Sequence, residues 1–344
     1  MRLKRYLDVL GYYSYFFKPE ISLLRKASNF ARYSLSSKSA QCHNMPISAQ
    51  IEPTLRCNLR CTMCVRDHFK QGDMSFADFK KVINQLNDVV KIHLQGLGEP
   101  FLNREIFSMI GYAASRNIMV SVITNGTVFS DEVIGRIAKS DIFEIGVSID
   151  AVDKRNYELI RVGANFERVM GGIKALNAAL RKYGSKTKIF LAVTIMKSNV
   201  GSISEFVRLA KSLDILKIVF QRVQTKDDFV KYYKSDFRKS KEFVTSGDVE
   251  VVVKKAMPLA ESLGVKILFE ESKVRCKWPW RGIYVTWNGD ITPCCMIVDP
   301  DSVQLGNILK EPIGRIWNSQ RYRQLRNSVR RRAPMPCCAG CRAI

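Results

Sequence analysis

The stretch Ile51-Glu-Pro-Thr-Leu-Arg-Cys57-Asn-Leu-Arg-Cys61-Thr-Met-Cys64 puts three thiols on the loop that leaves an expected strand at residues 48–55. Three cysteines without a close fourth do not complete a tetrahedral structural zinc site. An iron–sulfur cube has four iron corners, so three protein thiolates leave one corner open to a small molecule. The spacing therefore favours a reactive cluster. The simpler alternative is a set of buried structural thiols.

The spacing Cys57-x3-Cys61-x2-Cys64 resembles the cluster motif of the radical S-adenosylmethionine (SAM) superfamily. The resemblance implies that these cysteines hold a [4Fe-4S] cluster whose fourth iron binds SAM. It also implies reductive cleavage of SAM to a 5′-deoxyadenosyl radical that abstracts a substrate hydrogen. The family often has an aromatic residue before the last cysteine. Met63 stands there in this chain, and its thioether suits apolar contact with an adenine ring.

From Ser48 onward the sequence alternates between Val/Ile-rich runs and amphipathic stretches, which predicts a parallel sheet with crossover helices packed outside it. The expected strands are 48–55, 90–96, 118–124, 143–149, 187–196 and 216–223. The amphipathic stretches are 76–88, 104–116, 131–139, 166–183 and 203–213. Six units are too few for the complete eight-unit barrel. We expect an α/β fold built on a partial (β/α)6 TIM-like barrel, and the family resemblance implies the same fold.

A glycine-rich loop, Gln95-Gly-Leu-Gly-Glu-Pro100, follows the second expected strand. Gly96 and Gly98 allow a close backbone approach, and the Glu99 carboxylate suits an ammonium group. One strand–helix unit after the cysteine loop, this loop resembles the family's GGEP motif, which binds the SAM amino group. Leu97 replaces the second glycine of that motif, a change that backbone contacts tolerate if the local φ is negative.

Polar residues also end the third and fourth expected strands, where parallel α/β folds carry their reactive loops. Asn and Asp at strand ends are often simple turn formers. By resemblance, Thr124, Asn125, Ser148 and Asp150 match positions that line the SAM pocket, with Ser148 and Asp150 near the ribose. Arg161 matches an arginine that pairs with the SAM carboxylate or with a nearby acid, and its alternative is a helix-surface charge.

A second set of cysteines lies near the C-terminus, after a predicted β-hairpin that turns at Asn288-Gly289. Four thiolates suit either zinc or an iron–sulfur cube, and the spacing leaves both open. The order of cysteines, hairpin and Trp317-bearing helix resembles the SPASM/twitch extension of radical SAM enzymes. That resemblance implies one auxiliary [4Fe-4S] cluster held by Cys276, Cys294, Cys338 and Cys341. Cys295 and Cys337 are neighbours that could exchange roles with them.

The chain thus divides into four expected parts. They are a basic amphipathic N-terminal segment (1–45), the radical SAM partial barrel (46–224), a linker with a bridging helix and strand (225–271), and a SPASM/twitch-like auxiliary cluster domain (272–344).

The formal net charge of +23 over 344 residues is the unusual feature of the composition, and it is concentrated at the two ends. It indicates acidic partners or a merely solvated basic surface. We expect a flavodoxin or ferredoxin as electron donor. Residues 1–45 either lie on an anionic membrane or cover one end of the barrel. Nucleic-acid binding is disfavoured because no recognised RNA-reading fold is present.

No apolar run approaches the roughly 18 residues that a membrane span needs, and no signal peptide is recognisable. We therefore expect a cytoplasmic protein, with a peripheral location at the inner membrane face as a variant. Ten cysteines in a cytoplasmic chain favour metal or redox chemistry over disulfides.

Two clusters favour a radical SAM oxidoreductase that dehydrogenates its substrate or forms a C–C, C–S or C–N bond. An epimerase is the redox-neutral alternative, and Cys42, Cys295 or Cys337 would return the hydrogen. A basic metal-containing protein that binds nucleic acid or docks on a membrane is the alternative of another class. The sequence names neither a catalytic base nor the substrate, which is a small molecule, a lipid-linked precursor or a peptide.

Overall fold

The structure is a computed structural model that describes residues 21–36, 38–223, 231–233, 235–240, 242–269, 276–296, 303–339 and 341. Residues 1–20 of the expected basic amphipathic segment and the charged residues 224–230 fall outside the described residues.

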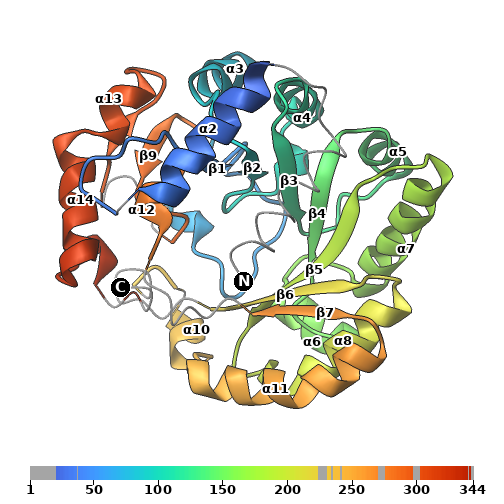
Figure 1. The fold of residues 1–344 in the computed structure, drawn as a ribbon. Helices are drawn as coiled ribbons and strands as arrows, with labels where there is room; N and C mark the ends of the chain where they lie inside the picture. Colours follow the sequence, from blue (N-terminus) through green and yellow to red (C-terminus); the bar gives the residue numbers. More distant parts are fainter. Residues whose placement is uncertain are drawn as a thin grey trace.

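One ten-stranded sheet runs through the molecule in the order β10-β9-β8-β1-β2-β3-β4-β5-β6-β7. Its strands are β1 (Ser48–Ile51), β2 (Lys91–Leu94), β3 (Met119–Thr124), β4 (Ile142–Ser148), β5 (Lys188–Ile195), β6 (Lys217–Arg222), β7 (Lys266–Phe269), β8 (Gly282–Val285), β9 (Asp290–Thr292) and β10 (Gly306–Asn307). Neighbouring strands from β8 and β1 through β7 pair in parallel. Figure 1 shows this sheet curving into an incomplete barrel, which confirms the expected fold.

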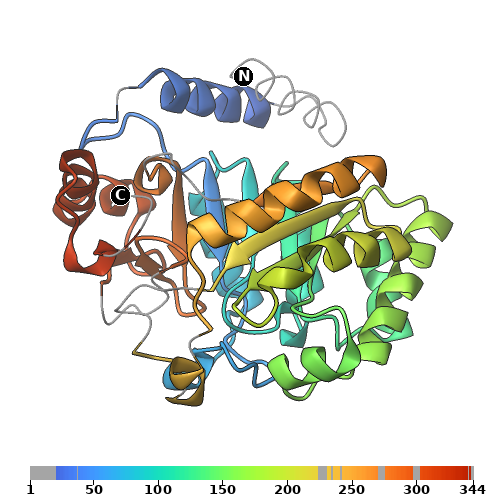
Figure 2. The ribbon, with the colours of Figure 1, turned by 90° about the horizontal axis from the view of Figure 1, so that it is seen from below.

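Helices pack along the outer side of the curved sheet (Figures 1 and 2). They are α3 (Phe76–Gln85), α4 (Ile106–Ser115), α5 (Asp131–Ala138), α6 (Lys154–Ile160), α7 (Phe166–Lys182), α8 (Ile203–Ser212) and α11 (Ser246–Ser262), and the shorter α10 (Ser235–Lys239) precedes α11. Ser75, Ser130 and Asn165 cap the starts of α3, α5 and α7 by accepting backbone N–H groups. Helix α6 is not among the expected amphipathic stretches, and the one residue that indicates its start is the capping Asp153, just after β4.

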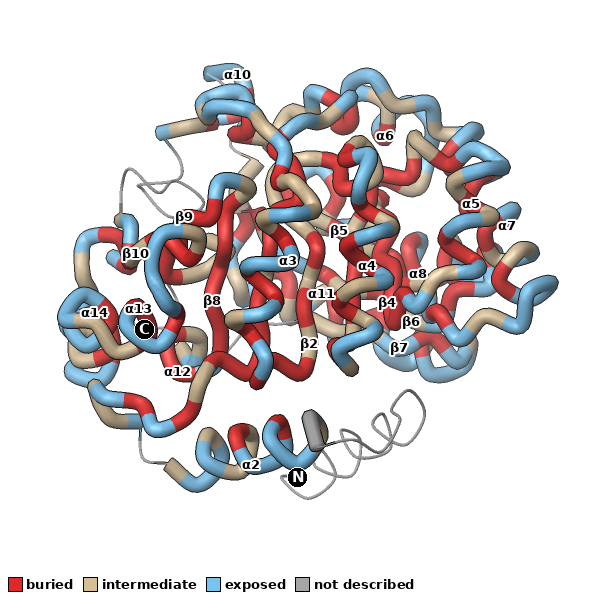
Figure 3. The backbone as a smooth tube through the Cα atoms, turned by 90° about the horizontal axis from the view of Figure 1, so that it is seen from above, coloured by how far each residue is buried: buried red, intermediate tan, exposed pale blue. Residues whose placement is uncertain are grey.

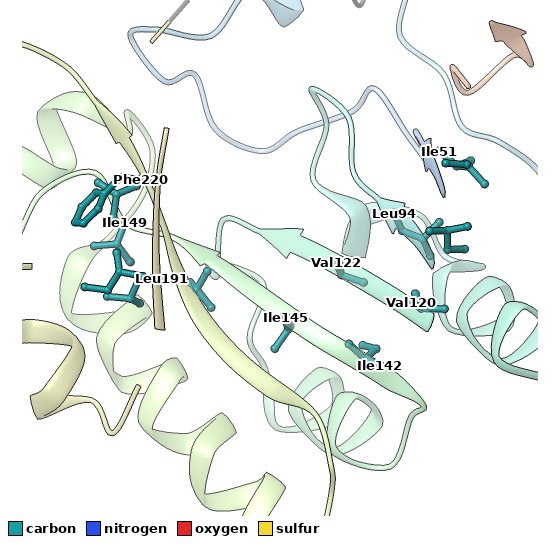
Figure 4. Close-up of a cluster of buried hydrophobic side chains, with 14 of the residues drawn as sticks. Ile51, Leu94, Val120, Val122, Ile142, Ile145, Ile149, Leu191 and Phe220 are labelled. Atoms are coloured by element: carbon teal, nitrogen blue, oxygen red, sulfur yellow. The ribbon is translucent and has the colours of Figure 1, made fainter. Parts of the chain in front are cut away.

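The main core lies between the sheet and these helices. Figure 4 shows side chains from successive strands forming this layer, and Figure 3 shows buried residues following the strands. The labelled residues are all almost fully buried: Ile51, Leu94, Val120, Val122, Ile142, Ile145, Ile149, Leu191 and Phe220. Alternation within each strand sends the intervening residues, such as His93, to the inner side of the barrel.

The segment expected as a linker contributes to the barrel itself. Its strand β7 pairs in parallel with β6, from Lys217↔Lys266 to Phe220↔Phe269. Helix α11 begins at a capping box formed by Thr245 and Asp248. The sheet therefore gains a seventh parallel strand beyond the six expected units.

The C-terminal part continues the same sheet from its other side. Strand β8 pairs in parallel with β1, from Ser48↔Gly282 to Ile51↔Val285. The expected hairpin is present as β8 and β9, and Gly289 adopts the positive φ of 87° that its turn requires. The short helices α12 (Trp278–Arg281) and α13 (Ile313–Trp317) and the longer α14 (Gln320–Arg331) lie around it (Figure 1).

Helix α2 (Ile21–Leu35) lies across the end of the barrel where the strands begin (Figure 2). Its Lys26 ammonium donates to the carbonyl oxygens of Arg116 (2.9 Å) and Asn117 (2.7 Å), just before β3. Its Arg25 pairs with Asp88, just before β2, at 2.9 Å. These contacts favour the covering role expected as one alternative for residues 1–45. None of the helices described is long and apolar enough to cross a membrane.

Three charged side chains meet inside the barrel. Glu144 of β4 binds Lys91 of β2 at 3.0 Å and Lys217 of β6 at 2.5 Å. Side chains from three alternate strands converge only on the concave side of a curved sheet. Burial of Glu144 opposes ionisation, but the two lysines outweigh it and lower the pKa of Glu144 to about 2.

We expect Glu144→Gln to lower the free energy of unfolding at pH 7 by about 2–3 kcal/mol, because two half-buried ammonium groups lose their counter-charge. A carboxyl with a depressed pKa stabilises the fold above its unfolded value of 4.5 and loses that contribution as the pH falls towards about 2. The difference in melting temperature between wild type and variant should therefore shrink from pH 5 to pH 3. A difference that stays constant with pH would contradict this.

Candidate active site

The first cysteine set lies on the loop after β1, held from two sides. The backbone N–H groups of Arg60 and Thr62 donate to the carbonyl oxygens of Val162 (3.0 Å) and Ile160 (2.9 Å) at the end of α6. The Asn58 side chain accepts from Asn125 at 3.0 Å at the end of β3. The loop is thus tied to the ends of two neighbouring barrel units.

Cys57, Cys61 and Cys64 are half-buried thiols that lie close enough together to affect one another. Burial raises the pKa of all three, and that of Cys61 to about 12 despite the opposing charge of Arg161. Neighbouring thiolates raise the pKa of Cys61 further. Such thiols become thiolates when a cation compensates their charge, so this donor set fits an iron–sulfur cluster.

A cavity of about 500 Å³ opens beside this loop. Its lining residues are Cys57, Asn58, Arg60, Arg66, Asp67 and Gln71. Arg66 is buried, and its Nε has no hydrogen-bond partner in the part of the chain that the structure describes. Its charge acts on both Cys57 and Cys64 and lowers their pKa values against the larger effect of burial. The Arg66 guanidinium is also paired with Asp67 at 2.8 Å, and a buried positive charge at this place suits a site lined by thiolates.

Glu99 ties the glycine-rich loop to the end of β3. Its carboxylate accepts from the Thr124 hydroxyl and the Asn125 N–H, both at 2.7 Å, and from the Phe101 N–H at 3.2 Å. Burial raises the pKa of Glu99 to about 7, although these bonds lower it. The structure thus brings together three of the expected SAM-pocket residues. It also shows the Glu99 oxygens already engaged by the chain itself.

Gly96 and Gly98 are required by close packing against the segment that leads to the cysteines. A Cβ on Gly98 would lie 2.3 Å from the Thr54 carbonyl oxygen, and one on Gly96 would lie 2.2 Å from Glu52 Oε1. The Glu99 N–H donates to the Arg56 carbonyl oxygen at 2.8 Å. The glycine-rich loop and the cysteine loop therefore form one packed unit, and Leu97 occupies the position between the two glycines that admits a side chain.

Asp150 and Arg161 form a buried ion pair at 2.7 Å. Asp150 also accepts from the Thr194 N–H at 2.7 Å, so β4 and β5 are joined at the same rim. Burial would lower the pKa of Arg161, but Asp150 and the nearby Cys61 raise it above its usual value. Arg161 pairs with a nearby acid, which was one of its two expected partners.

The remaining expected residues lie at the same rim. Ser148 ends β4 two residues before Asp150 and is partly exposed, and Met63 is partly buried against the core.

Asp150→Asn should lower the free energy of unfolding by about 3–5 kcal/mol, because it leaves the Arg161 charge buried without a partner. The matched control is Asp214→Asn, which removes an ion pair with Arg181 whose side chains are 65% and 71% exposed. That control should cost no more than about 1 kcal/mol. Urea denaturation of the anaerobically purified protein measures both. Equal losses for the two variants would contradict the role assigned to the buried pair.

The second cysteine set gathers beside the β8–β9 hairpin. Burial raises the pKa of Cys294 well above its usual value, with further contributions from Cys295, Cys276 and Cys341. Burial and Cys341 likewise raise the pKa of Cys276. These four thiols therefore lie near one another.

Cys338 is one tight turn from Cys341, whose N–H donates to the Cys338 carbonyl oxygen at 3.1 Å. The Sγ atoms of Cys338 and Cys337 lie 3.8 Å apart, and both residues are buried. In the described residues, no three His, Cys, Asp or Glu side chains converge as they would around a single metal ion. A cube presents separate iron corners to its ligands and needs grouped thiols instead.

Sequence reasoning missed Glu52 and Arg66. Glu52 directly follows a buried strand, which is the same polar ending that pointed to Thr124 and Asp150. That pattern, applied to β1, could have found Glu52. Arg66 lies two residues after Cys64 in the run Val65-Arg-Asp-His. The polar residues of this run are typical of an exposed segment, and nothing in the sequence indicates that Arg66 is buried.

Comparison with known proteins agrees with this geometry. Residues 51–210 match the model of the radical SAM superfamily, and residues 276–342 match that of an iron–sulfur cluster-binding domain, SPASM. The chain is 23% identical over 322 residues to the tungsten-containing aldehyde ferredoxin oxidoreductase cofactor-modifying protein of Pyrococcus furiosus, covering 85% of this chain and 86% of that protein. It is 24% identical over 348 residues to the subtilosin biosynthesis protein AlbA of Bacillus subtilis, covering 94% of this chain and 72% of that protein.

Among solved structures, SuiB of Streptococcus suis bound to its precursor peptide SuiA superposes with a TM-score of 0.67 at 16% identity. The match covers 87% of this chain and 69% of that chain, and it shows a shared fold. This chain belongs to the radical SAM superfamily and carries a C-terminal SPASM iron–sulfur domain. Its cofactors are SAM, a SAM-binding [4Fe-4S] cluster and an auxiliary cluster, as the sequence resemblance implied.

Proposed function

We propose that this radical SAM enzyme carries out a net oxidation of its substrate, by dehydrogenation or by C–C, C–S or C–N bond formation. When bound, the cofactors would supply three things. They are one electron that splits SAM into methionine and a 5′-deoxyadenosyl radical, that radical as the group that abstracts a substrate hydrogen atom, and an auxiliary cluster that accepts the electron the substrate gives up as it loses a proton. In this proposal Cys57, Cys61 and Cys64 hold the SAM-binding cluster. The auxiliary ligands are Cys276, Cys294, Cys338 and Cys341.

The observation that carries the proposal is the pairing of β8 with β1. The first thiol set follows β1, and the second is gathered by the hairpin that β8 begins. Both sets are therefore attached to neighbouring strands of one sheet. A fixed separation between two redox centres suits passage of an electron between a substrate held near one and an acceptor at the other.

The rim residues have distinct tasks in this proposal. The backbone of Gly96 and Gly98 and the carboxylate of Glu99 shape the place for the SAM amino group. Thr124 and Asn125 are held there by Glu99. Ser148, Asp150 and Arg161 face the ribose and carboxylate, and Met63 contacts the adenine. Arg161 stays charged beside Asp150, so it orients an anionic group without exchanging a proton.

Net oxidation is favoured over epimerisation by the burial of two candidate hydrogen donors. Cys42 and Cys337 are 8% and 5% exposed and belong to the hydrophobic core. A thiol that returns a hydrogen atom must reach the substrate radical. Cys295 remains the half-buried candidate for that alternative.

We propose a peptide as the first substrate class to test. The support is that AlbA takes part in the biosynthesis of a bacteriocin and that SuiB was solved with a precursor peptide. The name of the Pyrococcus relative, a cofactor-modifying protein, keeps a small or lipid-linked molecule as the second class. An acidic flavodoxin or ferredoxin is the proposed electron donor, since the formal charge is +23. We also propose a cytoplasmic location, with peripheral membrane contact through residues 1–45 as a variant.

Anaerobic reconstitution should load about eight irons per chain, two cubes of four, and reduction should then release 5′-deoxyadenosine from SAM. Cys57→Ala should hold about four irons and release no 5′-deoxyadenosine, because its SAM-binding cluster is lost. The matched variant Cys341→Ala should also hold about four irons yet still cleave SAM. Iron assays and chromatography of 5′-deoxyadenosine measure these outcomes. SAM cleavage by Cys57→Ala would falsify the proposal.

The substrate class can be found by hydrogen transfer. Extracts of the host organism grown in heavy water are separated into a peptide fraction and a small-molecule fraction, and each is incubated with the holoenzyme, unlabelled SAM and reductant. The fraction that contains the substrate should yield 5′-deoxyadenosine carrying deuterium, detected by mass spectrometry. We expect the label with the peptide fraction. Label arising only from the small-molecule fraction would overturn the peptide assignment.

A further inference from the structure

Glu52 is a buried carboxylate between the glycine-rich loop and the C-terminal domain. It directly follows β1, and only 2% of its surface is exposed. Its own N–H donates to the Val285 carbonyl oxygen at 2.9 Å, which continues the pairing of β1 with β8. Burial raises the pKa of Glu52 to about 7, although its hydrogen bonds lower it. Glu52 has no role in the proposed chemistry.

One side of the Glu52 side chain fixes the position of the glycine-rich loop. Its Oε1 accepts the Leu97 N–H at 3.2 Å. Gly96 packs so tightly against the same side chain that a Cβ there would lie 2.2 Å from Oε1 and 2.4 Å from Cγ. The position of Gly96 and Leu97 therefore depends directly on where the Glu52 side chain is held.

The other side of Glu52 is held by the C-terminal hairpin. The Tyr284 hydroxyl donates to Oε1 at 3.3 Å, and the Trp287 N–H donates to Oε2 at 3.4 Å. Tyr284 is fully buried in β8, and its pKa is raised well above the usual value by burial first and then by Glu52 and Cys295. The hydroxyl therefore stays protonated as a donor, close to the second cysteine set.

Trp287 extends this contact to the chain that follows the cysteine loop. Its indole Nε1 donates to the Lys70 carbonyl oxygen at 3.2 Å, and its ring lies against Gly72, where a Cβ would be 2.4 Å from the ring. The hairpin thus touches both the glycine-rich loop, through Glu52, and the chain that follows Cys64.

The three donors explain why this position carries a carboxylate. Leu97 N–H, Tyr284 O–H and Trp287 N–H all point at the two Glu52 oxygens, which only accept when the carboxyl group is ionised, and these three hydrogen bonds favour the ionised form. Glutamine would turn an amide N–H towards at least one of these donors. An apolar residue would leave all three donors buried without a partner.

We propose that Glu52 is a positioning residue through which the C-terminal iron–sulfur domain sets the SAM-binding loop, so that SAM affinity depends on the Tyr284–Glu52 contact. This inference rests on the proposed assignment of the Gly96–Glu99 loop to SAM. It makes the auxiliary domain part of the SAM site mechanically, independently of any electron it accepts.

The test is Tyr284→Phe, which removes one hydroxyl outside both the glycine-rich and the cysteine loops. In the reconstituted holoenzyme we expect the dissociation constant of SAM, measured by anaerobic calorimetry, to rise about five- to tenfold. Iron content should stay at that of the wild type. The matched control is Tyr322→Phe in the same domain, whose buried hydroxyl has no hydrogen-bond partner among the described residues, and it should leave the SAM dissociation constant unchanged.

A second measurement separates positioning from general damage. At a SAM concentration that saturates the wild type, the change that SAM causes in the electron paramagnetic resonance signal of the reduced SAM-binding cluster should be incomplete in Tyr284→Phe and restored by more SAM. Glu52→Gln should weaken SAM binding as well. The double variant Tyr284→Phe/Glu52→Gln should bind SAM no more weakly than Glu52→Gln alone, because both substitutions remove the same contact.

Wild-type SAM affinity in both Tyr284→Phe and Glu52→Gln would overturn this inference and leave the proposed function intact. Additive losses in the double variant would also overturn it, because the two residues would then act separately. Failure of the wild-type holoenzyme to bind SAM would instead refute the proposed function, and the inference would fall with it.

Discussion

The parallel pairing of β1 on both sides is the constraint on which the rest of the molecule depends. Four residues, Ser48–Ile51, pair with β2 on one side and with β8 on the other. The chain leaving β1 carries the first thiol set, and the strand beside it starts the hairpin of the second. Since strand neighbours lie about 4.8 Å apart, the sheet holds the two strands that lead to the two thiol sets at a fixed separation. Backbone pairing, more than any side chain, decides that the two parts act as one.

Three buried carboxylates hold the loops at the rim of the barrel in place. Glu52, Glu99 and Asp150 each follow or lie just beyond a strand, and each accepts donors from a different neighbouring segment. The cost of burying these groups is offset because their oxygens are well supplied with donors. They join successive loops into a ring of fixed geometry. A small molecule that enters such a ring meets preoriented groups and pays little to reorganise them.

Much of this was predictable, and the reasons for the rest are physical. The cysteine spacing, the glycine-rich loop and the strand–helix alternation are local patterns, so they predicted the fold and the cofactors. Pairing between distant segments has no local signature, so the sequence showed neither β8 beside β1 nor β7 beside β6. The Trp317-bearing helix expected in the C-terminal domain is two helices, α13 and α14, because Ser319 caps a new start after Asn318. Two of the partners of Glu52, Tyr284 and Trp287, lie more than two hundred residues away, which no local pattern reports.

Helix α2 affects the direction from which a substrate can reach the barrel. It lies across the end of the barrel where the strands begin, anchored by Lys26, and the ion pairs of Glu144 cross the interior. For the described residues, α2 therefore covers the end of the barrel opposite the rim that carries the cysteine loop. A substrate has to approach from that rim or from the side where the sheet does not close, between its edge strands β7 and β10. A helix that covers one end of an open sheet restricts the direction of approach without restricting the length of the molecule that is bound.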